Sequence, residues 1–216
     1  MGSLKVGRFT LGICATNSYY VFDEDKKDED GFYHAVFFDP ADKGDKIYEE
    51  LYNNKILVDL ILLTHGHFDH ILGAEKLREL SGAKVISLDK EQALCGDVFL
   101  NLSNQFGGGT TIVPDSFVTD GETITAAGFS VSVIATPGHT SGGCCYYFKD
   151  EGVLMSGDTL FEESVGRTDF PTSSLSELVR SIKEKLFILP DDTIVYPGHG
   201  DVTTIGHEKQ YNPFVV

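Results

Sequence analysis

The sequence predicts an α+β fold in which two mixed β-sheets pack face to face with helices on the outside. Segments with strand and helix patterns follow one another in the order strand-rich half, helix, strand-rich half, helix. Most connections between the strand patterns are short, which favours hairpins over the long crossovers of a doubly wound parallel sheet. With 216 residues, 41% of them hydrophobic, the chain can bury a sizeable core, so we expect residues 1–216 to form a single domain.

Alternating apolar residues and turn residues predict the elements of the first half. Strands are expected at residues 4–11, 18–22, 35–38, 56–63 and 84–88, and helical segments at 43–53, 71–80 and 89–95. Residues 23–31 are too highly charged for burial and are expected to form a solvated hairpin tip. Gly107, Gly108 and Gly109 mark a flexible loop, since no phosphate-binding motif follows them.

The second half is expected to contain two hairpins, a capped helix and a last strand. The hairpins are expected at residues 123–136 and 144–156, and the strand at 193–196. Ser174 and Glu177 form a capping box ahead of apolar residues at helical spacing. Polar residues of the metal-binding type stand directly after the core strands, where a rigid scaffold can present them together: His65, His139, Asp158 and His199.

The chain is acidic, with 17 Lys and Arg against 33 Asp and Glu and a net charge of −16. A negative surface repels polyanions, so nucleic acid and anionic membranes are poor partners. The sequence shows neither a signal peptide nor an apolar run long enough to span a bilayer. We therefore expect a cytoplasmic monomer that acts on a small molecule. The four cysteines form no CxxC pair and are expected to be idle thiols, with Cys144 and Cys145 on opposite faces of a strand.

Three of the seven histidines, His65, His67 and His70, lie within six residues after the apolar run at 56–63. An extended backbone returns side chains to one face every second residue, so His65 and His67 can point at the same ion. Asp69 and His70 follow where the chain turns toward a helix, far enough away to reach a second ion. Imidazole favours zinc or iron, and the interleaved carboxylate tolerates iron or manganese. The alternative is a polar loop that is rich in histidine by chance.

Several motifs in a fixed order extend over nearly the whole chain. They are Asp39, THGHFDH at 64–70, TPGHTSG at 136–142, SGDTLF at 156–161, SVGRTDFP at 164–171 and YPGHG at 196–200. Together they resemble the metallo-β-lactamase fold superfamily and, within it, the short glyoxalase II-like (hydroxyacylglutathione hydrolase-like) enzymes. The resemblance implies an αββα sandwich with a two-metal cleft at one edge of the sheets.

The resemblance also implies a role for each motif residue. The first metal would be held by His65, His67 and His139, and the second by Asp69, His70 and His199. Asp158 would bridge both metals through its two carboxylate oxygens, and Asp39 would orient a ligand. His34 and His207 match no motif, so neither is expected to be a ligand. Zinc is the expected metal, with iron or manganese as alternatives.

The implied chemistry is hydrolysis of a thioester such as S-lactoylglutathione. Two adjacent cations can share a water, lower its pKa and leave a metal-bound hydroxide aimed at a carbonyl. Asp69 would orient this hydroxide as the catalytic carboxylate. Arg167 lies where glyoxalase II enzymes place a basic side chain against glutathione, although an internal salt bridge with Asp169 is the alternative. The resemblance is to the short form, so we expect no separate C-terminal glutathione-binding domain of the kind with which larger glyoxalase II enzymes grip glutathione, which leaves a non-glutathione ester or lactone as an alternative substrate.

Two other classes of function stay open. Persulfide dioxygenases share the fold and much of the segment 166–170, but they use one iron held by two His and one Asp. A metal-binding module without turnover is the other possibility. Lactam-cleaving enzymes of the fold often have Cys at the position of Asp158, and quorum-quenching lactonases have Tyr at that of Phe161, so neither activity is favoured.

Overall fold

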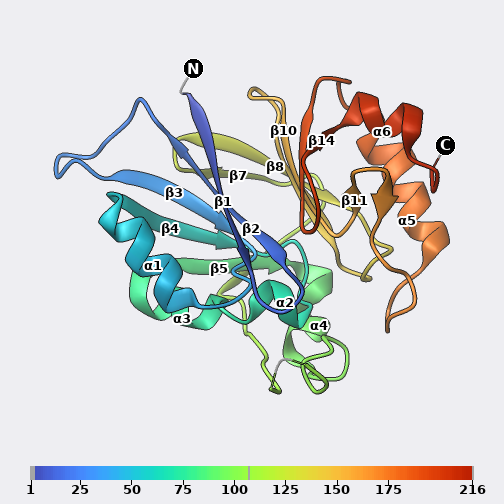
Figure 1. Ribbon diagram of the computed structural model, residues 1–216, viewed down its shortest axis with the longest axis horizontal. Coiled ribbons are helices and arrows are strands. Elements are labelled where there is room, and N and C mark those ends of the chain that lie inside the picture. Colours follow the sequence, from blue (N-terminus) through green and yellow to red (C-terminus); the bar gives the residue numbers. More distant parts are fainter. Residues whose placement is uncertain (1–2, 107, 216) are drawn as a thin grey trace.

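The computed structural model describes residues 3–106 and 108–215. Two six-stranded sheets pack against each other, and helices cover the outer face of each sheet (Figure 1). This arrangement confirms the predicted sandwich of two mixed sheets.

The first sheet contains the elements of the N-terminal half. In spatial order its strands are β1 (Leu4–Leu11), β2 (Thr16–Asp23), β3 (Tyr33–Phe38), β4 (Ile56–Leu62), β5 (Lys84–Leu88) and β6 (Ser116–Val118). The first three strands are antiparallel, whereas β3 to β6 run parallel. Helices connect the parallel strands, as such crossovers require.

The second sheet is mostly antiparallel. In spatial order its strands are β14 (Thr203–Thr204), β13 (Ile194–Pro197), β10 (Val153–Gly157), β9 (Cys144–Phe148), β8 (Phe129–Ala135) and β7 (Thr123–Ala126). Only the β10–β13 pair is parallel within this sheet, as the structure describes it. A separate small hairpin pairs β11 (Leu160–Phe161) with β12 (Ser164–Val165).

Helices lie on both outer faces of the sandwich. Those of the first half are α1 (Gly44–Asn53), α2 (Phe68–Ile71), α3 (Ala74–Ser81), a 3₁₀ turn at Asp89–Glu91 and α4 (Gln92–Gly96). Those of the second half are α5 (Leu175–Ser181), a π turn at Ile182–Leu186 and α6 (Ile205–Tyr211). The Ser174 hydroxyl accepts a hydrogen bond from the Glu177 amide, so the predicted N-terminal cap of α5 is confirmed.

Three apolar layers follow from the alternation of side chains along the strands. In β3, Phe38 belongs to the central layer between the sheets, whereas Phe37 packs in the outer layer with α1 and α3. In β9, Cys144 likewise faces the central layer, and Cys145 faces the layer beneath α5. The expectation that these two cysteines face opposite sides is therefore confirmed, and every described cysteine is a free thiol.

The secondary structure differs from the sequence prediction at one helix and at four short strands. The helix expected at 71–80 is divided into α2 and α3 at Gly73, whose amide bonds the Pro40 carbonyl; a Cβ there would lie 2.8 Å from the Asp42 carbonyl oxygen. The short strands β6, β11, β12 and β14 were not predicted, because two or three residues carry no readable alternation. Of the predicted glycine loop, Gly108 and Gly109 lie in a turn, and Gly107 is outside the described residues.

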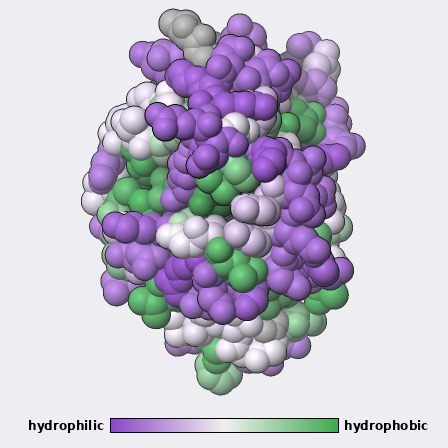
Figure 2. Space-filling model, turned by 90° about the vertical axis from the view of Figure 1, so that its left-hand side faces the viewer, coloured by the Kyte–Doolittle hydropathy of each residue, from purple (hydrophilic) through white to green (hydrophobic). Residues whose placement is uncertain are grey.

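One face of the molecule carries mostly hydrophilic side chains (Figure 2). On the face shown in Figure 2 they cover most of the molecule, and apolar side chains appear between them in small areas. Among the described residues, no helix has the length and apolar composition needed to cross a membrane.

Candidate metal centre

The ends of five strands bring the candidate ligands together. β3 and β4 run parallel in one sheet, and β10 and β13 run parallel in the other. β8 runs in the same direction as β10, because both are antiparallel to β9. The carboxyl-terminal ends of these strands are followed by the predicted site residues: Asp39, His65 and His67, His139, Asp158, and His199.

The segment after β4 supplies four candidate ligands. The strand ends at Leu62, so His65 and His67 lie in the loop beyond it and not on the strand end that the sequence predicts. Asp69 and His70 follow on the single turn of α2. The change from loop to helix directs the two pairs to different places, as predicted.

The donor atoms form two groups. In the first, ligand atoms of His65, His67 and His139 all lie within 4.8 Å of one another, and Nδ1 of His67 is 2.9 Å from Nε2 of His139. In the second, atoms of Asp69, His70 and His199 lie within the same limit. The structure therefore brings together the residues that the sequence analysis assigned to each ion.

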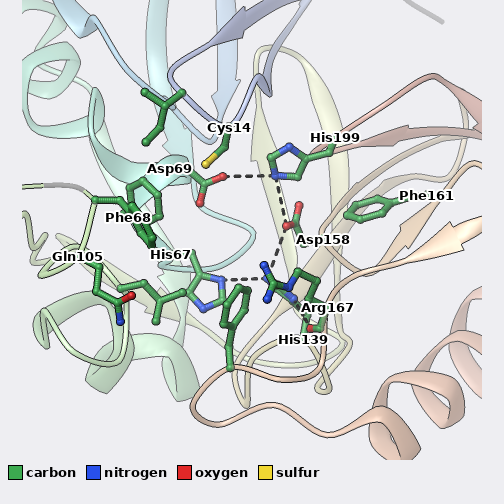
Figure 3. Close-up of a pocket in the computed structure, with 14 residues that line it drawn as sticks. Cys14, His67, Phe68, Asp69, Gln105, His139, Asp158, Phe161, Arg167 and His199 are labelled. Carbon is green, nitrogen blue, oxygen red and sulfur yellow. Dashed lines mark hydrogen bonds and ion pairs between the residues drawn. The ribbon is translucent and has the colours of Figure 1, made fainter.

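Asp158 lies between the two groups, with a nitrogen of each within reach of its carboxylate (Figure 3). Its Oδ2 is 3.5 Å from Nε2 of His139 and 3.4 Å from Nε2 of His199, and its Oδ1 is 3.3 Å from Nε2 of His70. This position matches the predicted bridging role. Gly198 permits the close packing, because a Cβ there would lie 2.2 Å from Asp158 Oδ1.

Four of the donor atoms are buried and lack a hydrogen-bond partner, an arrangement that a bound metal ion would explain. Nε2 of His65, His67 and His70 and Oδ1 of Asp158 have no hydrogen-bond partner among the described residues. A buried polar atom without a partner costs roughly 1–3 kcal/mol, so four such atoms facing one another need an occupant. A bound cation would satisfy all four atoms, because imidazole nitrogens and carboxylate oxygens are ordinary metal ligands.

Burial and neighbouring charges set the protonation of these groups. Burial lowers the pKa of His65 well below its usual range and that of His67 to about 3, so both imidazoles are neutral and can donate a lone pair. Burial would raise the pKa of the Asp158 carboxyl, but His70 and His199 beside it hold that pKa well below its usual range. The same balance, with His70 as the main partner, lowers the pKa of Asp69 to about 2. Both carboxylates are therefore ionised at neutral pH.

Asp39 orients the second group without entering it. Its Oδ1 accepts from the Thr64 amide at 2.7 Å, and its Oδ2 accepts from the Thr64 hydroxyl at 2.6 Å and faces Nδ1 of His70 at 3.0 Å. Asp39 also falls within a donor group with His65 and His70. Because both of its oxygens already have protein partners, we assign it to holding His70 with Nε2 turned toward Asp158, as the sequence analysis expected.

Glu91 is a supporting residue that the sequence analysis missed. It is fully buried, and its Oε1 accepts from the Gly66 amide at 3.0 Å while its Oε2 accepts from the Thr140 hydroxyl at 3.1 Å. It thus connects the loop of His65 and His67 to the loop of His139. Burial raises the pKa of this carboxyl to about 7. A single glutamate in a short helical segment gives no signal in the sequence that would reveal this role.

Arg167 makes the internal ion pair that the sequence analysis gave as its alternative. Its Nε and Nη2 donate to the two carboxylate oxygens of Asp169 at 3.0 and 2.7 Å, and its guanidinium lies 4.2 Å from the Phe170 ring centroid. Its backbone carbonyl faces Nδ1 of His139 at 2.8 Å and so orients that ligand. The side chain still lines the cleft, but it is already paired there.

The two remaining histidines lie outside the donor groups found among the described residues. His34, in β3, bonds Asp59, and His207, in α6, bonds Glu163.

The metal centre opens into a cleft of about 610 Å³. Five of the candidate ligands form part of its lining: His67, Asp69, His139, Asp158 and His199. The free thiol of Cys14 lies beside Asp69 at this cleft, a neighbour that the sequence analysis did not foresee (Figure 3).

Comparison with known proteins identifies similar chains of the same length. Residues 11–199 match the family model described as the Metallo-beta-lactamase superfamily. The probable metallo-hydrolase YqgX of Bacillus subtilis is 33% identical over 98% of both chains, and the hydroxyacylglutathione hydrolase GloC of Haemophilus influenzae is 31% identical over 92% of both.

Solved structures give the same picture. The BLEG-1 B3 metallo-beta-lactamase superposes with a TM-score of 0.89 at 38% identity, over 98% of this chain and 99% of that one. TTHA1623 in a di-iron-bound form gives 0.81 at 30% identity, over 96% and 99%. ETHE1 from Myxococcus xanthus gives 0.79 at 29% identity, over 98% and 84%.

Proposed function

The chain belongs to the metallo-beta-lactamase superfamily, and we propose that it is a dinuclear metal-dependent hydrolase that cleaves a thioester. The observation that carries this proposal is the position of Asp158 between two groups of candidate donor atoms, among which Nε2 of His65, His67 and His70 is buried without a hydrogen-bond partner. S-lactoylglutathione is the reference substrate, supported by the 31% identity to the hydroxyacylglutathione hydrolase GloC. Zinc is the proposed metal, and the similarity to a di-iron-bound structure supports iron as the alternative.

In this proposal each residue near the centre has a defined task. When bound, two divalent cations would activate a water and polarise the thioester carbonyl. His65, His67 and His139 would hold one cation, Asp69, His70 and His199 the other, and Asp158 both.

Asp69 would orient the attacking water. Its Oδ2 accepts a hydrogen bond from the Thr16 hydroxyl at 2.7 Å, which fixes the carboxylate at the floor of the cleft. Because its pKa is about 2, this carboxylate is an ionised acceptor at neutral pH and a weak proton carrier. The water oxygen bonds to the carbonyl carbon, the carbon–sulfur bond breaks, and the products are a carboxylate, a thiol and a proton.

The proposal is tested by measuring metal content beside thioester hydrolysis in the parent and in Asp158→Ala. We expect about two metal ions per parent chain, and in the variant a loss of both metals and of most of the rate. Asp150→Ala, in the exposed turn between β9 and β10, is the matched control and should keep both properties. Full metal content and unchanged turnover in Asp158→Ala would refute the bridging assignment.

A second candidate function is oxygenation of a persulfide at a single iron, which the segment 166–170 leaves open. It receives support from the similarity to ETHE1 from Myxococcus xanthus. The second donor group of Asp69, His70 and His199 favours the dinuclear hydrolase. One iron per chain, together with oxygen uptake in the presence of glutathione persulfide, would establish this candidate in place of the hydrolase.

A further inference from the structure

The walls of the cleft above the metal centre are apolar. Six large apolar side chains from separate parts of the sequence line it: Ile13, Phe68, Leu102, Phe106, Phe161 and Phe170. Ile13 and Phe106 are 78% and 60% exposed. Single exposed apolar side chains are ordinary, but their gathering around a set of polar donors is typical of a ligand site.

The aromatic rings are placed on both sides of the donors. Phe68 and Phe106 stack with their centroids 5.8 Å apart on one side. Phe170 lies 5.5 Å from the ring of His67, and Phe161, across the donors from Phe68 in Figure 3, lies 6.0 Å from the ring of His199. A substrate whose reacting carbonyl is held at the donors therefore has aromatic surface available for each of its two halves.

Along the part of the cleft that the structure describes, an anionic substrate meets no unpaired lysine or arginine side chain. Among the described residues that line it, Arg167 is the only Lys or Arg. Its Nε and Nη2 donate to the Asp169 carboxylate, which neutralises its charge, and the Phe170 ring lies against its face. The chain as a whole carries a net charge of −16, which adds a general repulsion of anions. Glutathione thioesters carry two carboxylates and one ammonium group in their thiol half, and the described lining of the cleft offers these carboxylates no unpaired Lys or Arg side chain.

We propose that the preferred substrate is a thioester whose thiol half is uncharged and apolar, and that the Arg167–Asp169 pair disfavours glutathione thioesters. This inference rests on the proposed thioesterase function and narrows its substrate class. The reaction adds the water oxygen to the acyl carbon, breaks the carbon–sulfur bond, and releases a carboxylate, an uncharged thiol and a proton. The apolar thiol half would pack against the aromatic walls, where burial of its surface lowers the barrier.

The test compares two thioesters with the same acyl group. The lactoyl thioester of 2-phenylethanethiol and S-lactoylglutathione are offered to the metal-loaded enzyme, and each kcat/KM is divided by the rate of hydroxide-catalysed hydrolysis. We expect the phenylethyl thioester to be favoured roughly tenfold or more, the range that a hydrophobic pocket provides. Calorimetry should give the same order of affinity for the non-hydrolysable thioethers of the two thiols.

Two variants test separately the contribution of the apolar wall and that of the Arg167–Asp169 ion pair. Phe106→Ala should lower kcat/KM for the phenylethyl thioester several-fold and lower it less for S-lactoylglutathione. Phe99→Ala removes an equally exposed ring of the same segment that does not line the cleft, and should change neither. Asp169→Asn frees Arg167 and should raise kcat/KM for S-lactoylglutathione several-fold, an increase that added salt removes.

The outcomes distinguish the inference from the function on which it rests. If the loaded enzyme hydrolyses S-lactoylglutathione at least as efficiently as the phenylethyl thioester, the thioesterase function stands and the substrate inference is wrong. If Asp169→Asn leaves the preference unchanged, the role of the ion pair is wrong. If neither thioester is hydrolysed by protein with full metal content, the proposed function fails and the inference fails with it.

Discussion

Replacement of Glu91 tests whether the metal centre depends on a buried link between two loops. In Glu91→Ala, the Gly66 amide and the Thr140 hydroxyl lose their acceptor inside the core. Each unsatisfied buried donor costs about 1–3 kcal/mol, so with two such donors we expect the free energy of unfolding to fall by roughly 2–6 kcal/mol. That is a large part of the ~5–15 kcal/mol that stabilises a typical domain.

Glu91→Gln is the matched control, because an amide keeps the shape and the hydrogen-bonding capacity of the carboxyl group. Its oxygen can accept from the Gly66 amide, and its NH₂ group can donate to the Thr140 oxygen. At pH 5 we expect this variant to unfold within about 1 kcal/mol of the parent. Metal affinity should follow the same order, since Gly66 stands between His65 and His67.

The free energy of unfolding of the parent should depend on pH, and the raised pKa of Glu91 determines the direction of the change. Burial raises the pKa of Glu91 from its usual 4.5 to about 7, so the protonated form is favoured in the folded state. The corresponding stability is fully present below pH 4.5 and is lost as the pH rises through about 7. Glu91→Gln removes the titration, so its stability relative to the parent should rise by roughly 3 kcal/mol over this interval.

The assay is unfolding by guanidinium chloride at several pH values, with a chelator present so that all variants are compared without cations. Metal affinity is measured separately by competition with a chelating dye at pH 7.5. Equal stability of Glu91→Ala and Glu91→Gln at pH 5 would refute the link between the loops. If the difference in free energy of unfolding between Glu91→Gln and the parent does not change with pH, the raised pKa of Glu91 is refuted.

Two further predictions concern other parts of the chain. The hydrogen bond to Asp59 raises the pKa of His34 above 6.5, so the charged pair stabilises the fold below pH 6.5, and this stability is lost as the pH rises through the raised pKa. In Asp59→Asn, NMR titration of the imidazole should show a lower pKa for His34, and an unchanged value would contradict the pairing. Gly198→Ala would place a Cβ 2.2 Å from Asp158 Oδ1, so it should lower the free energy of unfolding by roughly 1–3 kcal/mol and reduce metal content. Thermal unfolding and metal analysis measure the two effects. Gly96→Ala, with open space around its Cβ position, should change neither.

The candidate ligands could be predicted from the sequence because their motifs are local and ordered. His65, His67 and His70 stand within six residues, and the others follow recognisable strand ends. The sandwich was predictable for a related reason, since alternation along β3 and β9 determines which side chains face each layer.

The supporting contacts could not be predicted, because they join residues far apart in the chain through atoms that any Glu or Asp could offer. Glu91 reaches Thr140 across 49 positions. The ion pair of Arg167 is local, and the sequence could raise it as an alternative but not decide it, since a guanidinium two residues from a carboxylate can also extend toward solvent. The apolar cleft escaped prediction as well, because Ile13, Phe106 and Phe161 come from segments without a common periodicity.

The bridging position of Asp158 connects occupancy of the centre to the integrity of both sheets. Donors from each sheet face this one carboxylate, so separation of the two layers would divide the donor set between them. A chain opened at this seam would bind cations far more weakly than the closed one, so cations would stabilise the closed form by an amount that grows with the logarithm of their free concentration. Metal supply in the surroundings would thus set the lifetime of the folded chain as well as the number of loaded centres.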